Sequence, residues 1–101
     1  MAISIDPGDL NVSGYESITV ADTAIGFTAA TVGAAGIKGA FCTVETAQIR
    51  FRMDGTNPTS AEGHVLDPGQ TLTIINQGTL VNTMFIRTGA TSGVLKVTFL
   101  K

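Results

Sequence analysis

The chain has 101 residues, of which 44 % are hydrophobic and 14 % are charged, and its net charge is −2. This length fits one domain, the single cysteine (Cys42) excludes a disulfide within the chain, and the single histidine (His64) leaves too few ligands for a structural metal site. The lysine and arginine residues are scattered, which argues against a nucleic-acid-binding protein, and no apolar run is long enough to span a membrane.

The charged fraction is low, because soluble domains average about 25 % charged residues. It predicts that part of the surface is hidden against other chains; the alternative is an ordinary surface rich in threonine and glycine. The start of the chain, M-A-I-S-I-D-P-G-D, carries acids where a secretion signal would carry lysine or arginine. We therefore expect the protein to stay in the compartment where it is made, with its cysteine reduced.

The first fourteen residues, 1–14, alternate weakly between apolar and polar side chains at Ile3, Ile5 and Leu10. Pro7 interrupts the alternation and makes a helix unfavourable. The sequence predicts an N-terminal arm or an edge strand here.

Residues 15–20 and 25–28 follow as predicted strands. Segment 29–39 is rich in alanine, which favours a helix, but it also holds three glycines. Each glycine costs a helix about 1 kcal/mol relative to alanine, so we expect a loop.

Two strands are predicted in the middle of the chain, at 40–45 and 48–53. The second has a period of two, with Ile49, Phe51 and Met53 on one face and Arg50 and Arg52 on the other. The intervening Thr46-Ala47 is a poor hairpin turn. The two runs therefore form one hairpin, belong to different sheets, or are one bent strand.

The strand at 48–53 ends at Asp54-Gly55, a strong reversal signal. A polar loop with Pro58 follows, and the chain returns to an apolar step at Val65-Leu66. Beyond it we expect reversals at 67–70, 76–78 and 89–93, and strands at 71–75, 80–88 and 94–100. In the strand at 80–88, Val81, Thr83 and Phe85 are predicted to share one face, opposite Asn82, Met84 and Ile86. In the strand at 94–100, Leu95, Val97 and Phe99 are predicted to point inward.

Seven or eight short strands at a spacing of roughly 8–12 residues indicate an all-β protein. The predicted fold is an antiparallel β-sandwich or a jelly-roll-like barrel. We expect a single domain at 15–101, preceded by the arm or edge strand at 1–14.

No set of side chains has the spacing of a catalytic site. His64 would need Ser60 or Cys42 as nucleophile and a carboxylate such as Asp67 behind it, and the sequence gives no sign that these residues meet. Cys42 alternates with polar residues in a strand and is interpreted as a small buried hydrophobe. We predict no catalytic, cofactor-binding or metal-binding residues, and therefore no enzyme.

Arg50 and Arg52 project from one strand face and admit two interpretations. They contact another subunit or a ligand through charge-assisted hydrogen bonds, or they form a solvated face paired with Glu45 or Glu16.

The run I-R-F-R-M-D-G-T-N-P-T-S-A-E-G-H at 49–64, followed by T-S-G-V-L-K-V-T-F at 91–99, resembles a group of small tailed-phage virion proteins. The resemblance extends from Phe41 to Phe99, and D-G-T-N-P-T at 54–59 is its most specific part.

This resemblance implies a capsid decoration (cement) protein, made in the host cytoplasm and carried on the capsid surface of the virion. Its implied partners are the major capsid protein and further copies of itself in a homotrimer, without cofactor, nucleic acid or membrane. The predicted subunit or capsid contacts are Ile3, Ile5, Leu10, Arg50 and Arg52. The alternative is a tail-fibre or baseplate module that binds a host-surface glycan.

Overall fold

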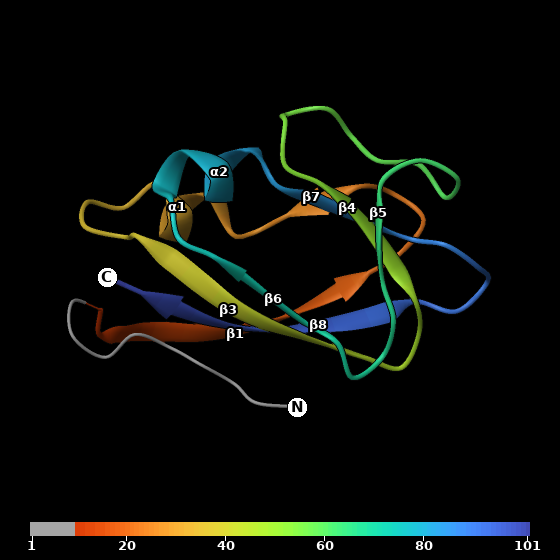
Figure 1. Cartoon of the computed structure of the whole chain (residues 1–101), viewed down its shortest axis with the longest axis horizontal. Coiled ribbons are helices and arrows are strands. Elements are labelled where there is room, and N and C mark those ends of the chain that lie inside the picture. Colours follow the sequence, from red (N-terminus) through yellow and green to blue (C-terminus); the bar gives the residue numbers. More distant parts are fainter. Residues whose placement is uncertain (1–9) are drawn as a thin grey trace.

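Alternating side chains build two antiparallel four-stranded sheets in the computed structural model, which describes residues 10–101 (Figure 1). The first sheet has the strand order β1-β8-β3-β6, formed by Val12–Val20, Gly93–Leu100, Gly39–Glu45 and Thr71–Ile74. The second sheet has the order β2-β7-β4-β5, formed by Ile25–Gly26, Met84–Arg87, Ile49–Arg52 and His64–Leu66. The prediction of an all-β antiparallel sandwich is confirmed.

The core lies between the two sheets, and its centre is aromatic. Phe27 follows β2 and makes edge contacts with Phe85 of the second sheet and Phe99 of the first, with ring centroids 5.3 and 5.9 Å apart. Leu95 and Val97 are fully buried beside Phe99, as their alternation in β8 predicts. Phe27 therefore joins the two layers through side-chain packing.

The strands at 40–45 and 48–53 belong to different sheets, as β3 and β4. The chain crosses between the layers at Thr46, which has a φ of +78° and is the single non-glycine residue with positive φ among residues 10–101. Gly93 lies against this crossing: a Cβ there would be 2.5 Å from Ile49 Cγ2 and 2.9 Å from the Ala47 carbonyl oxygen. The crossing thus requires a glycine at position 93.

We expect Gly93→Ala to lower the free energy of unfolding by about 1–3 kcal/mol, because the added methyl group overlaps both the crossing and β4. Gly89→Ala is the matched control, since nothing lies within 4 Å of a Cβ at that position. Urea denaturation of the two variants checks the difference; equal stabilities would contradict the role given to Gly93.

Two short helices replace predicted loop and strand. α1 (Ala29–Val32) lies within the segment predicted to be a loop, and α2 (Gln77–Asn82) occupies residues predicted as a reversal and the start of a strand. The Asn76 side chain caps α2 by accepting a hydrogen bond from the Thr79 N–H at 2.9 Å. Both predictions are wrong at these residues.

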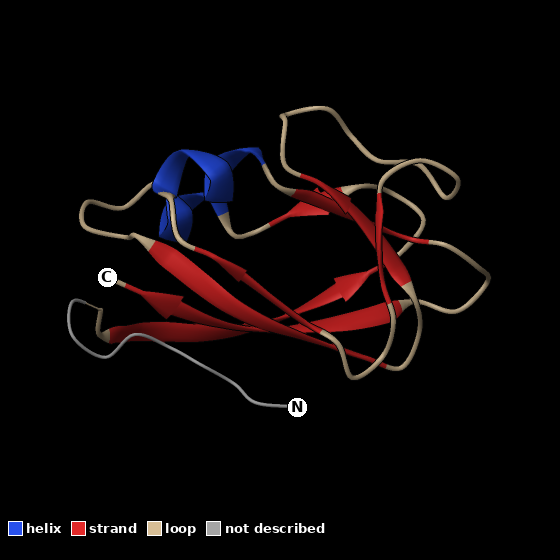
Figure 2. Ribbon diagram, viewed as in Figure 1, coloured by secondary structure: helices blue, strands red, loops and turns tan. Residues whose placement is uncertain are grey.

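The helices lie together at one end of the sandwich (Figure 2). Gln77 Nε2 joins them by donating to the carbonyl oxygens of Val32 and Ala34, at 2.9 and 2.8 Å. Val81 belongs to α2 and is 55 % exposed, whereas Thr83 and Phe85 are fully buried, so the prediction that Val81 shares one strand face with them is wrong.

At the N-terminal end, β1 begins at Val12 and forms one edge of the first sheet. The sequence predicted an arm or an edge strand at 1–14, and the structure shows that residues 12–14 belong to an edge strand. Leu10 lies just before it and is half-buried, while Ile3 and Ile5 lie outside the described residues.

Candidate functional site

The signature loop, residues 53–63, connects the antiparallel neighbours β4 and β5. It holds the D-G-T-N-P-T sequence on which the resemblance rests. Pro58 is buried within it, and Thr59 and Glu62 exchange backbone hydrogen bonds of 2.9 and 3.2 Å. The loop therefore has internal structure of its own.

Arg50 fixes this loop to the strand that precedes it. Its Nε donates to the Ser60 carbonyl oxygen at 3.1 Å, and its Nη1 donates to the Gly63 carbonyl oxygen at 2.7 Å. Gly63 has a φ of +136°, and a Cβ there would lie 3.2 Å from Pro58 Cβ and 3.3 Å from Arg50 Cβ. The loop thus packs closely over the side chain of Arg50.

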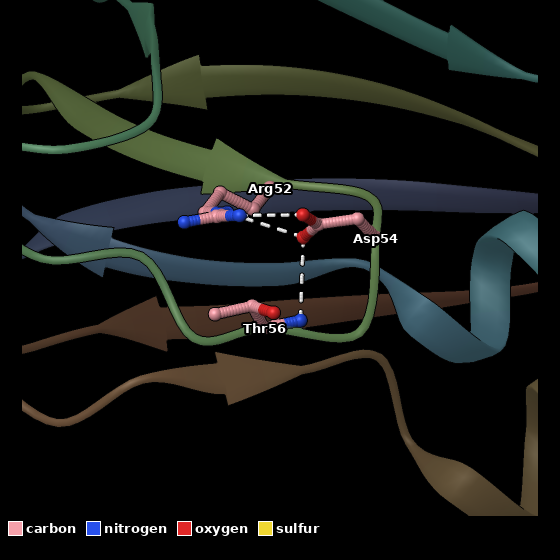
Figure 3. A network of polar contacts seen from close by, with 3 residues as sticks. All are labelled: Arg52, Asp54 and Thr56. Carbon is pink, nitrogen blue, oxygen red and sulfur yellow. Dashed lines mark hydrogen bonds and ion pairs between the residues drawn. The ribbon is translucent and has the colours of Figure 1, made fainter.

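Arg52 pairs with Asp54 at the start of the loop (Figure 3). The guanidinium donates through Nε, at 3.1 Å, and through Nη2 to the two carboxylate oxygens, and the Thr56 N–H also donates to Asp54, at 3.2 Å. The hydrogen bond from Arg52, followed by that from Thr56, lowers the pKa of Asp54. The same contact with Asp54 raises the pKa of Arg52.

We expect Arg52→Gln to raise the pKa of Asp54 toward its ordinary value of 3.8, which a carboxyl-carbon NMR titration measures directly. Because the folded-state pKa is the lower one, the contact stabilises the fold above pH ~4 and loses its effect as the pH falls through the lowered pKa. An unchanged titration of Asp54 in the variant would contradict the assignment.

Gly55, the second residue of the Asp-Gly turn, is hydrogen-bonded to α2 instead of β4. The Gly55 N–H donates to the carbonyl oxygen of Asn82, at the end of α2, at 3.2 Å, and the φ of Gly55 is +83°. Together with the two arginines, this bond ties the start, middle and end of the loop to β4 and α2. The loop is therefore held in a defined conformation on the surface by hydrogen bonds along its length.

An open depression of about 510 Å³ lies beside the loop, lined by Arg52, Met53, Asp54, Glu62, Gly63 and His64. The His64 ring rests against Phe51, with ring centroids 5.3 Å apart. The carboxylates, guanidinium and imidazole that line this depression can form hydrogen bonds with a hydroxylated or charged ligand.

Among residues 10–101, no hydrogen bond joins His64 to Ser60, Cys42 or Asp67, the residues considered as its partners in catalysis. Cys42 is fully buried in the first sheet, as predicted, and burial, with a smaller contribution from Glu16, raises the pKa of its thiol to about 12. Asp67 accepts a hydrogen bond from Gln48 Nε2 at 2.8 Å, while His64 contacts Phe51. Within residues 10–101 no three His, Cys, Asp or Glu side chains gather as metal ligands.

Arg50 and Arg52, which were predicted to contact a subunit or the capsid, both bind groups within their own chain. Neither pairs with Glu45 or Glu16: Arg50 binds the loop backbone, and Arg52 binds Asp54. Neither contact was predicted from the sequence, although for Arg52 the signal was present as a carboxylate, Asp54, two residues farther along the chain. Their role in subunit or capsid contact stays a prediction.

No family model, curated protein or solved structure matches the chain. In the part that the structure describes, neither helix has the length and apolar character needed to cross a membrane.

Proposed function

We propose that this chain is a capsid decoration protein of a tailed phage, which binds the outside of the assembled shell and stabilises the head by bridging capsomers. The observation that carries the proposal is the D-G-T-N-P-T sequence, which resembles that of small phage virion proteins and occupies the ordered signature loop. A protein that binds only the assembled shell shifts the equilibrium toward assembly by mass action.

The proposed partners are the major capsid protein and further copies of this chain, with the threefold assembly that the resemblance implies. The part of segment 1–14 that precedes β1 is the proposed arm onto the shell or a neighbouring copy, through Ile3, Ile5 and Leu10. Because Arg50 and Arg52 are bonded to the signature loop, we propose that they act by presenting the loop to the partner.

The test mixes the purified full chain with expanded phage shells and follows co-sedimentation and the temperature at which the shells come apart. Binding at a fixed number of copies per shell and a higher disassembly temperature are expected. A chain that stays in the supernatant and leaves the disassembly temperature unchanged would refute the proposal.

The second candidate function is a tail-fibre or baseplate module that binds a host-surface glycan. The depression beside the signature loop favours it, since Asp54, Glu62 and His64 offer acceptors and donors for sugar hydroxyls. The absence of tryptophan weighs against it, because sugar rings commonly stack on exposed aromatic side chains. Clear binding on a glycan array, lost in Glu62→Ala, would select this function over shell binding.

A further inference from the structure

The outward side of the first sheet is nearly free of charge. Core residues and outward residues alternate along most of its strands, and the outward positions hold serine and threonine residues together with Tyr15, Phe41, Val94 and Leu100, of which Leu100 is only 1 % exposed. Lys96 of β8 and Glu45 of β3 are the only charged side chains among them. A sheet face this poor in charge suits contact with another protein surface, because the centres of such contacts are depleted of charged residues.

The two charges are neighbours of opposite sign. Thr43 lies opposite Lys96 in the β3–β8 register, and Glu45 is two residues farther along β3, which makes it a diagonal neighbour of Lys96 at about 7–8 Å between backbones. Lys96 Nζ donates to Ser17 Oγ at 3.1 Å, and Arg52–Asp54 is the ion pair found within residues 10–101. The opposite charges thus lie side by side without pairing to each other.

This arrangement is complementary to itself. A two-fold axis in the plane of contact, passing midway between Lys96 and Glu45, exchanges the two positions. Each lysine then lies opposite the glutamate of the second copy, and the uncharged residues around them face other uncharged residues of the same surface. Any other surface would have to supply the matching pair of charges.

The size of the face sets the strength of the contact. Four strands spaced about 4.8 Å apart and roughly seven residues long give a plan area of about 400–500 Å² per copy. Two copies would bury on the order of 1,000 Å², which is the lower limit for a specific interface. The association should therefore be reversible and depend on protein concentration.

We propose that the outer face of the first sheet is a self-association surface that binds the same face of a second copy of this chain, with Lys96 of each copy against Glu45 of the other. The contact has two-fold symmetry, so it differs from the contact within the threefold unit implied by the resemblance. It does not require the proposed function, because it concerns this chain alone.

The experiment measures the mass of the full chain by sedimentation equilibrium at low ionic strength over a range of concentrations. An equilibrium between masses differing by a factor of two is expected. Glu45→Lys or Lys96→Glu alone should raise the dissociation constant about tenfold, and the charge-swapped double variant should return it to within about threefold of the original. Circular dichroism shows that each variant is folded.

Asp22→Lys is the matched control, since it reverses the charge of an exposed carboxylate between β1 and β2, outside both the first sheet and the signature loop. It should leave the dissociation constant unchanged. The inference is overturned by a mass of one copy at all concentrations, by a three-copy mass that ignores both single variants, or by a double variant that associates no better than the single ones. Shell binding is measured separately, so failure here leaves the proposed function standing.

Discussion

Phe27→Ala is expected to lower the free energy of unfolding by about 3–5 kcal/mol, the largest effect of any single substitution considered for this protein. Phe27 is 6 % exposed and contacts Phe85 and Phe99, which belong to opposite sheets. Removing its ring leaves a cavity between the layers and deletes both edge contacts. Domains of this size have a total stability of about 5–15 kcal/mol, so the variant should keep little of it.

Urea denaturation of Phe27→Ala, Phe27→Leu and Tyr15→Ala measures the effect. Leucine restores most of the lost volume, so Phe27→Leu should fall between the original chain and Phe27→Ala. Tyr15 is 64 % exposed on the outer face of β1, and its loss should change stability by no more than about 0.5 kcal/mol. If Tyr15→Ala costs as much as Phe27→Ala, the layer-joining role of Phe27 is wrong.

The sandwich could be predicted because its strands carry their own signal. β8 alternates between fully buried and half-buried residues along most of its length, and its pairing with β1 and β3 keeps both long neighbours in the same phase. Since a strand with one core face must place every second side chain inward, the period of two in Leu95, Val97 and Phe99 was sufficient. No distant contact was needed to interpret it.

The helix α2 could not be predicted in the same way, because its stability comes from outside the segment. Gly78 and the β-branched Val81 both disfavour a helix locally. Asn76 caps it from the preceding turn, and Gln77 reaches the backbone of Val32, which is 45 residues away. The Asn cap was the one local signal, and Asn-Gln-Gly is equally typical of a simple reversal.

The sequence predicted the loop of the candidate site but not the side chain that holds it in place. Asp54-Gly55 and Pro58 correctly marked a shaped loop, but the side chain that holds it, Arg50, belongs to the preceding strand. An arginine on the polar face of a strand is normally solvated, and nothing local shows that its partners are carbonyl oxygens ten and thirteen residues later. Contacts of this kind depend on the path of the loop, which composition does not determine.

The signature loop should therefore open when Arg50 is removed. In Arg50→Met, the apolar stem of the side chain still covers β4, but the hydrogen bonds to the carbonyl oxygens of Ser60 and Gly63 are lost. Hydrogen bonds to a charged group contribute about 1.5–3 kcal/mol each. The bond to Gly63 is partly buried, whereas the bond to Ser60 is exposed and water replaces part of its contribution. We expect the free energy of local opening to fall by about 2–3 kcal/mol, with the global stability changing less.

Hydrogen exchange gives the measurement, because the amides of Thr59 and Glu62 donate within the loop and report on its opening. Their exchange should be roughly 30- to 150-fold faster in Arg50→Met. Arg52→Met is the matched control on the same strand face: its lost partner is the exposed Asp54 carboxylate, and exchange at Thr59 and Glu62 should stay within about fivefold of the original. If the two variants accelerate exchange equally, Arg50 does not hold the loop. If only Arg50→Met accelerates exchange, this variant should also bind shells more weakly, because an open loop must be ordered again on binding.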